Sequence, residues 1–280
     1  MNGIIVIDKE KNVTSRDVVN KISKILKIKK IGHTGTLDPI ATGVLVLCVG
    51  RATKLVDMIT GYDKEYIARA CLGVLTDTLD ITGNILYEEN FNISKEKIVD
   101  VLNSFIGEYE QEVPLYSAVK IDGKKLYEYG RSNIDIELPK RNVKINSIKL
   151  VSDIDYKNGK VYFSFLTNVS KGTYIRSLIN DIGKKLGTYG TMIELRRIKQ
   201  GNFKIEDSSS YDDLKIISIE DVLKKYYTVE LDDELYKKVS NGVKLKNVYN
   251  QDIVVFKYNN KVIAVYKKSD EYIKPYKMLI

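Results

Sequence analysis

The chain has 280 residues, a length that suits one large domain and one smaller domain. Its composition, 44% hydrophobic and 29% charged, is that of a folded globular protein and excludes wholesale disorder. One histidine and two cysteines are too few for a His-rich zinc site, a cysteine-ligated iron–sulfur cluster or a disulfide framework. A catalytic triad would have to use His33, so the main candidates for catalysis are carboxylates, lysines, arginines and tyrosines.

The charge balance is basic. The 45 Lys and Arg residues exceed the 37 Asp and Glu residues and give a formal net charge of +8. A basic balance favours a polyanionic partner, with nucleic acid ahead of a membrane, although surplus surface lysine also occurs without one. The start of the chain lacks a signal-peptide pattern, and the longest strongly apolar run is far shorter than the roughly 20 residues of a membrane span. With Cys48 and Cys71 expected as buried free thiols, we expect a reduced, cytoplasmic protein without a membrane segment.

The first hundred residues predict alternating strands and helices. The expected strands are 3–7, 44–49 and 64–72. A helix is expected from Thr14 or Ser15, because the apolar residues that follow recur at helical spacing. A loop punctuated by glycines, residues 32–43, separates this helix from the second strand. Ser94 is placed to cap a further helix.

The second half predicts a β-rich stretch and then mixed elements. Residues 107–167 read as mostly β, with a turn at 121–123. A helix over 174–185 closed by Gly187, a strand over 192–198 and a short helix around 219–226 follow. From about residue 229 the chain consists of short alternating runs separated by turn signals, which is typical of a small β-barrel, and no helix of clear length is visible there. We place a domain boundary near residue 228.

Residues 120–150 concentrate the positive charge. Eight basic and four acidic residues give this stretch a net charge of +4, half the surplus of the whole chain. Tyr127 and Tyr129 are interleaved with the lysines, as on a surface that follows an RNA backbone. A solvated hairpin with scattered lysines would produce the same pattern.

The densest motif is IGHTGTLDPIATGVLVLCVGRATKL, residues 31–55. Gly32, Gly35 and Gly43 permit positive φ and close approach of a ligand to the backbone. Asp38 precedes Pro39 at the tip of a loop that leads into a buried strand. A single carboxylate on a rigid loop suits a nucleophile or a general base. On the pattern alone, the Asp-Pro pair and the glycines could equally serve only to build a turn.

The segment GHTGTLDPIATGVL closely resembles the catalytic segment of the TruB-type tRNA pseudouridine synthases. Further resemblances to the family extend over nearly the whole chain, in GIIVIDKEKNVTSRDVV, DKEYIARACLGVLTDTLDITG, VPLYSAVKIDGKKLYEYGR, SKGTYIRSLINDIGKKLG and IELRRIKQGNF. The resemblance implies an α+β fold, with a catalytic domain over 1–228 whose mixed, mainly antiparallel sheet is flanked by helices and which carries a basic RNA-binding insertion at about 120–150. It also implies a small PUA-like β-barrel over 229–280, although that match is less specific.

The resemblance implies the catalytic residues. Asp38 would be the catalytic carboxylate, attacking either C1′ of the ribose or C6 of the base, in a reaction that needs no cofactor and no metal. Tyr66 matches the tyrosine that stacks on the flipped base, although a tyrosine in an alternating strand is more often a core residue. Arg176, in KGTYIR, matches the arginine that would keep Asp38 ionised and oriented. On its own pattern Arg176 could also be an ordinary residue on a helix surface.

Four further residues fall on positions that the resemblance assigns to substrate binding: Tyr174 and Leu195 in the uridine pocket, His33 at the flipped nucleotide, and Lys9 beside the pocket in a supporting role. A lone histidine is more often a hydrogen-bonded structural residue, and Leu195 would by default be core. One departure from the family pattern is Asn12, which stands where a glycine is usual in the first motif. Asparagine tolerates left-handed backbone better than most residues, so it can replace glycine there.

The function implied is conversion of uridine 55 in the T arm of tRNA to pseudouridine, by a monomer that requires no protein partner. Two alternatives remain open from the sequence. One is a tRNA-binding folding chaperone with secondary catalysis, and the other is an RNA-guided pseudouridine synthase, which usually carries a longer C-terminal region.

Overall fold

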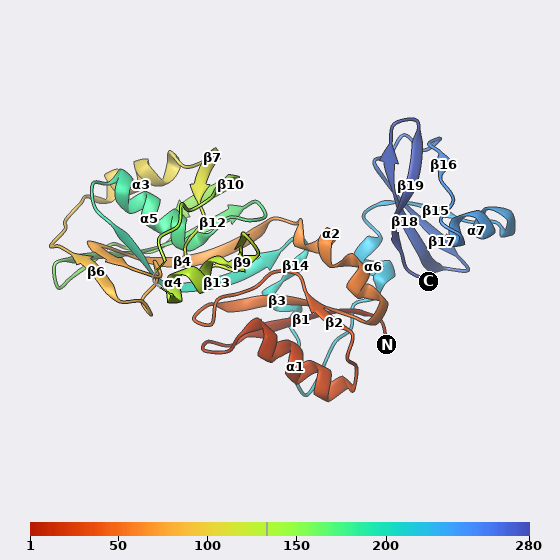
Figure 1. Cartoon of the computed structure of the whole chain (residues 1–280), viewed down its shortest axis with the longest axis horizontal. Coiled ribbons are helices and arrows are strands. Elements are labelled where there is room, and N and C mark those ends of the chain that lie inside the picture. Colours follow the sequence, from red (N-terminus) through yellow and green to blue (C-terminus); the bar gives the residue numbers. More distant parts are fainter. Residues whose placement is uncertain (133) are drawn as a thin grey trace.

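A computed structural model describes residues 1–132 and 134–280, in which ten strands form one large mixed sheet (Figure 1). Its main path runs β1-β3-β13-β4-β12-β10-β7, while β2, β14 and β11 are added beside β3, β13 and β12. The strands are β1 (Gly3–Lys9), β2 (Ile31–His33), β3 (Thr42–Val49), β4 (Lys64–Leu72), β7 (Gly107–Glu112), β10 (Lys140–Leu150), β11 (Asp155–Lys157), β12 (Lys160–Val169), β13 (Gly190–Gln200) and β14 (Phe203–Lys204). Neighbouring strands are antiparallel except for β3 and β13. This confirms the predicted α+β class and the mainly antiparallel sheet.

The parallel contact between β3 and β13 joins the two halves of the large sheet. It consists of the register Arg196 opposite Thr42 and Arg197 opposite Gly43. β13 also pairs along its length with β4, so that Arg197 lies opposite Tyr66 and Leu195 opposite Ala68. Segments far apart in the sequence, around residues 38, 66 and 197, therefore meet at the middle of the sheet.

Two helices flank the sheet as the sequence predicts. Helix α1 (Ser15–Leu26) begins after Thr14, whose hydroxyl accepts from the Asp17 N–H while the Asp17 carboxylate accepts from the Thr14 N–H. Its apolar face packs on β1 and β3. Helix α5 (Ile175–Lys185) packs its buried face on β13 and β4, in the principal core. The N-terminus of α5 is thereby held at the middle of the sheet.

Shorter elements complete the part of the chain that contains the large sheet. They are the short 3-10 helices η1 (Gly50–Leu55) and η2 (Ile205–Asp207), the helices α2 (Val56–Thr60), α3 (Lys95–Asn103) and α6 (Ile219–Leu223), and the hairpin of β5 (Val74–Thr76) and β6 (Ile85–Glu88). Ser94 caps α3 through a hydrogen bond from the Lys97 N–H, as predicted.

The stretch 107–167 is less β-rich than its pattern suggests. Between β7 and β10 the chain leaves the sheet and forms a short hairpin from two strands of two residues each, β8 (Lys120–Ile121) and β9 (Lys124–Lys125). Helix α4 (Leu126–Arg131) follows. The expected turn at 121–123 is present, with positive φ at Asp122 and Gly123. β10 itself pairs with β7 and β12 inside the large sheet.

A second sheet of five strands forms the C-terminal part, in the order β15-β17-β18-β19-β16. Its strands are β15 (Tyr227–Glu230), β16 (Leu245–Lys246), β17 (Ile253–Tyr258), β18 (Lys261–Ser269) and β19 (Tyr272–Met278). It has its own core, which includes Phe256 and Tyr266. The helix α7 (Asp233–Ser240) also belongs here, so the expectation that this tail contains no helix of clear length is wrong. Asp232 caps α7, because its carboxylate accepts a hydrogen bond from the Leu235 N–H at 2.7 Å.

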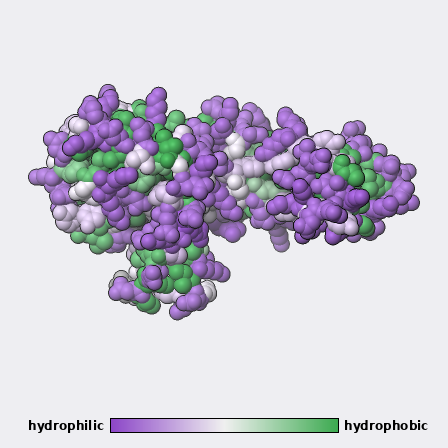
Figure 2. Space-filling model, turned by 90° about the horizontal axis from the view of Figure 1, so that it is seen from above, coloured by the Kyte–Doolittle hydropathy of each residue, from purple (hydrophilic) through white to green (hydrophobic). Residues whose placement is uncertain are grey.

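The C-terminal sheet projects from one end of the larger part, beyond α2 and α6 (Figure 1). Val255, Val262 and Val265 share a core cluster with Ile4 of β1 and with α6. Arg51 Nη1 also donates to the carbonyl of Leu279 at 3.1 Å. Hydrophilic residues cover most of the face in Figure 2, and hydrophobic residues gather over the wide lobe. In the described residues, no helix is both long and apolar enough to cross a membrane.

Candidate active site

Asp38 lies in the loop between β2 and β3, and two hydrogen bonds to backbone groups of this loop hold it in place. The Leu37 N–H donates to Ser15 Oγ at 2.9 Å, and the Asn12 N–H donates to the carbonyl of Pro39 at 2.8 Å. Asn12 has φ 63°, so asparagine does replace glycine in the left-handed region, as expected. The carboxylate of Asp38 is partly exposed at 34%. The loop therefore presents one accessible carboxylate on a fixed backbone.

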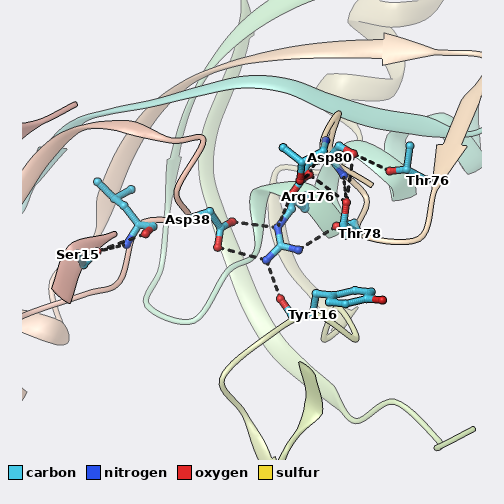
Figure 3. A network of polar contacts seen from close by, with 9 residues as sticks. Ser15, Asp38, Thr76, Thr78, Asp80, Tyr116 and Arg176 are labelled. Carbon is cyan, nitrogen blue, oxygen red and sulfur yellow. Dashed lines mark hydrogen bonds and ion pairs between the residues drawn. The ribbon is translucent and has the colours of Figure 1, made fainter. Parts of the chain in front are cut away.

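Arg176 faces Asp38 from the first turn of α5 (Figure 3). Its Nε lies 3.0 Å from Asp38 Oδ2, and its Nη2 donates to Asp38 Oδ1 at 3.4 Å. The Arg176 side chain is only 6% exposed. This is a two-contact pairing between guanidinium and carboxylate, which fixes the orientation of both groups.

The remaining donors of Arg176 bind two other segments. Nη1 donates to the carbonyl of Thr78 at 2.8 Å, and Nη2 donates to the carbonyl of Tyr116 at 3.0 Å. Asp80 lies 3.9 Å from Nε and accepts from Thr78 Oγ1 and from the Thr82 N–H and hydroxyl. The buried arginine thus joins the Asp38 loop, the Thr78–Asp80 turn and the segment between β7 and β10.

A cavity of about 500 Å³ opens beside Asp38, within the usual size range of a small-ligand site. Of the residues expected to bind substrate or the base, Tyr66, Tyr174 and Leu195 line it together with Asp38 and Arg176. Tyr66 and Leu195 are both 8% exposed. Five of the seven sequence-predicted site residues therefore surround one space.

Lys9 and His33 lie outside the lining of this cavity. The Lys9 ammonium is fully buried and donates to the carbonyls of Val13 at 2.6 Å and Pro39 at 3.3 Å, so it holds the Asp38 loop from behind. Burial lowers the pKa of Lys9 to about 8, with Arg197 adding to the shift and Asp38 opposing it. His33 is half-buried on β2, and burial together with Arg16 and Arg197 lowers its pKa. Its Nδ1 has no hydrogen-bond partner among the described residues.

Sequence reasoning missed several residues that shape the site. Asp80 and Gln111 are examples, as are the buried cations Lys64 and Arg197. Arg197 is distinguished by its burial as a charged residue within a strand. No pattern in the sequence reveals burial of that kind. Among the described residues, no group of three or more His, Cys, Asp or Glu side chains is placed to hold a metal ion.

The chain belongs to the TruB family of pseudouridylate synthases. Residues 23–175 match the model of the N-terminal domain of this family, and residues 176–241 match that of the tRNA pseudouridylate synthase B C-terminal domain. A protein of Clostridium tetani named tRNA pseudouridine synthase B is 44% identical over 294 residues, covering all of both chains. The protein of the same name from Lactobacillus acidophilus is 40% identical, covering 100% of this chain and 99% of its own.

Solved structures agree on the fold. A crystal structure of a Cbf5-Nop10-Gar1 complex matches with a TM-score of 0.70 and 25% identity, over 99% of this chain and 85% of that one. A structure of the archaeal box H/ACA sRNP Nop10-Cbf5 complex matches with a TM-score of 0.71 and 24% identity, over 99% and 86%. Both likenesses include the large sheet and the C-terminal sheet, because they span nearly the whole chain.

Proposed function

We propose that this chain converts uridine 55 in the T arm of tRNA to pseudouridine, with Asp38 as the catalytic carboxylate. The observation that carries the proposal is the Asp38–Arg176 pair, at 3.0 Å, on the wall of a cavity of about 500 Å³. The two residues occupy positions that resemble those of the catalytic Asp and its partner Arg in the TruB family. The relatives named tRNA pseudouridine synthase B supply the substrate class.

The reaction is an isomerisation. The bond between ribose C1′ and uracil N1 breaks, the base rotates, a bond forms between C1′ and C5, and the proton on C5 leaves while N1 gains one. Asp38 attacks C1′ or C6, and either step needs an ionised carboxylate. Arg176 orients that carboxylate, because its guanidinium lies against both carboxylate oxygens. Uridine and pseudouridine have the same atoms and the same number of electrons, so the reaction requires no oxidant, no reductant and no group donor.

The target base must leave the T-loop stack before Asp38 can reach it. Unstacking costs a few kcal/mol, which contacts inside the pocket must offset. Tyr66 offers a buried ring for stacking, and Tyr174 and Leu195 complete an apolar wall. Ser117 also lines the cavity, and its buried hydroxyl has no partner among the described residues, so it is available to hydrogen-bond the base.

The direct test is the modification of a tRNA transcript by the purified chain, with pseudouridine located by mass spectrometry. Wild-type protein should modify position 55 without added metal or cofactor. Asp38→Asn keeps the size of the side chain but removes its charge and replaces one accepting oxygen by a donor, so turnover should be abolished while tRNA binding stays largely intact. Near-wild-type turnover by Asp38→Asn would contradict the assignment. The matched control is Asp57→Asn, an exposed carboxylate outside the cavity.

The same assay separates the alternatives. A folding chaperone would refold tRNA equally well with Asp38→Asn and would yield little pseudouridine. An RNA-guided enzyme would require an added guide, so activity of the isolated chain on free tRNA excludes that mechanism. We propose that the chain acts alone, as a monomer, which size-exclusion chromatography of the active protein would test. Free Cys48 and Cys71, both buried, suit the reducing cytoplasm.

RNA binding should depend steeply on salt, because lysine contacts to phosphates release counterions. Segment 120–150 contributes to this surface, and Tyr127 reaches the cavity with Lys125 and Arg131 placed over its ring. An affinity that stays unchanged between low and moderate salt would contradict this part of the proposal.

A further inference from the structure

Three cations besides Arg176 line the cavity: Lys64, Lys171 and Arg197. Lys64 begins β4, Lys171 lies in the loop before α5, and Arg197 belongs to β13. None of the three has a carboxylate oxygen within 4.0 Å among the described residues. One end of the cavity therefore carries positive charge without a matching negative charge.

Lys64 and Arg197 are 7% and 1% exposed, although charged groups are rarely buried unless they are paired. Lys64 Nζ donates to the carbonyls of Thr60 and Tyr62, both at 2.6 Å. An ammonium has three donors, so one remains for another acceptor. Arg197 donates from Nε to the carbonyl of Val44 at 2.6 Å and from Nη2 to that of Gly35 at 3.0 Å.

The free end of the guanidinium and the lysine stem converge on Gly35. A Cβ added to Gly35 would lie 3.4 Å from Arg197 Nη1 and 3.9 Å from Lys64 Cε. Neutral donors would suffice to hydrogen-bond these backbone carbonyls. Two buried cations side by side instead repel one another, so their charges call for another explanation. Burial lowers the pKa of Lys64 to about 8, with smaller contributions in the same direction from Arg197 and Lys171 and an opposing one from Asp63. Asp63 does not neutralise the cluster, because its carboxylate accepts from Asn146 Nδ2 at 2.9 Å and lies beyond 4.0 Å from Lys64.

The cluster stands next to the proposed stacking residue. Lys64 and Tyr66 are two residues apart on β4, so both side chains point to the same face, on the order of 7 Å apart along the strand. Arg197 is the register partner of Tyr66 on the adjacent strand. A nucleotide whose base rests on Tyr66 can therefore place a neighbouring phosphate against these cations.

We propose that Lys64, Arg197 and Lys171 form a subsite for one phosphodiester of the RNA strand, adjacent to the nucleotide that enters the Asp38 cavity. This inference rests on the proposed function, since it takes RNA as the substrate. The phosphate supplies the missing negative charge and holds the strand where the target base meets Tyr66. Binding at the subsite thus favours the flipped-out conformation of the nucleotide.

The test is a scan of a T-arm stem-loop in which each linkage near the target is replaced, one at a time, by an uncharged methylphosphonate. Affinities are measured in an Asp38→Asn background, so that the RNA stays unreacted, with and without Lys64→Gln. At one linkage, the methylphosphonate should weaken RNA binding about tenfold when Lys64 is present. The same methylphosphonate should weaken binding little further in the Lys64→Gln variant. If every linkage costs the same factor with and without Lys64→Gln, the subsite does not exist.

Two further variants keep the result interpretable. Lys171→Gln alters an exposed side chain, so the fold is retained, and it should show the same linkage selectivity with a smaller loss. Lys157→Gln, an exposed lysine outside this cavity, should leave the pattern of the scan unchanged. The slope of log affinity against log salt should fall by about 0.7 to 0.9 with Lys64→Gln. Pseudouridine formation by the wild-type chain is measured in parallel, so a failure of the subsite and a failure of the proposed function give different results.

Discussion

The side-chain amide of Gln111 pairs with both backbone polar groups of Tyr174. Gln111 Oε1 accepts from the Tyr174 N–H at 2.7 Å, and Nε2 donates to the Tyr174 carbonyl at 3.1 Å. The second hydrogen on Nε2 goes to the hydroxyl of Tyr109 at 2.5 Å. Every polar atom of this buried amide is therefore used, which leaves it one orientation. Because Tyr174 directly precedes α5, Gln111 positions the turn that carries Tyr174 and Arg176.

Gln111→Leu keeps the approximate volume of the side chain but removes both contacts to Tyr174. We expect kcat for pseudouridine formation to fall tenfold or more, because Arg176 is no longer held against Asp38, while KM changes less. Unfolding should also become easier by about 1–3 kcal/mol, the usual effect of unpaired buried polar groups. Single-turnover kinetics and urea unfolding check the two effects. The control is Glu108→Ala on the same strand, and an equal loss of kcat there would mean that Gln111 acts only through general stability.

Arg176→Lys tests whether the charge or the shape of this side chain matters. Lysine preserves the positive charge but cannot contact both oxygens of Asp38 and the carbonyls of Thr78 and Tyr116 at once. We expect turnover to fall at least a hundredfold, with RNA affinity reduced much less. Asp80→Asn, which removes a charge 3.9 Å from Arg176 Nε, should lower turnover by a smaller factor. Retention of more than half the wild-type rate by Arg176→Lys would show that the multidentate geometry is dispensable.

The sequence predicts much of the fold because local signals agree with the tertiary structure. The cap of α1 at Thr14, the cap of α3 at Ser94 and the apolar strands expected over 3–7 and 44–49 are all set by neighbouring residues. It fails for α7, because half of its eight residues are charged and its apolar positions are few. It also fails between β7 and β10, where the pattern reads as mostly β although the chain leaves the sheet and places Tyr116, Ser117 and Tyr127 on the cavity wall.

The site is predictable only in part, because local sequence signals reveal some of its residues but not their long-range contacts. The motifs around Asp38, Tyr66 and Arg176 are recognisable as sequence, and the structure brings all three to one cavity. The contacts of Gln111 and Arg197 join segments over 60 residues apart, which no local pattern encodes. Of the three glycines expected to need special backbone, only Gly43 has a positive φ.

Gly43 is required by two separate constraints, which a matched pair of variants can separate. Its φ is +101°, and a Cβ there would collide with the carbonyl oxygen of Arg197 on β13. Gly107 has a similar φ of +118° but nothing within 4 Å of an added Cβ. Gly107→Ala should therefore cost about 1–3 kcal/mol of unfolding free energy from strain alone. Gly43→Ala should cost clearly more and also impair catalysis, because β3 must move away from β13. Equal destabilisation in urea unfolding would rule out the steric contribution.

Asp181 makes the stability of the α5 region depend on pH. Burial, with a smaller contribution from Glu112, raises the pKa of this carboxyl to about 6, while Lys184 and the Tyr109 hydroxyl act in the opposite direction. The unfolded chain releases the proton near the ordinary value of 3.8, so between that value and about 6 the folded state binds more protons than the unfolded state. The contribution of Asp181 to stability is therefore greatest at the acidic end and declines as the pH rises through about 6.

Asp181→Asn replaces the carboxyl by a neutral amide of the same shape and should remove this dependence. Relative to wild type, the variant should gain stability as the pH rises from about 4 to about 7, as measured by urea unfolding at several pH values. Other carboxylates contribute the same background to both proteins, so the difference isolates Asp181. Asp153→Asn, a fully exposed carboxylate, should show no such trend relative to wild type. A difference between Asp181→Asn and wild type that stays constant with pH would mean that Asp181 titrates alike in the folded and unfolded chains, and one that runs the other way would mean that folding lowers its pKa.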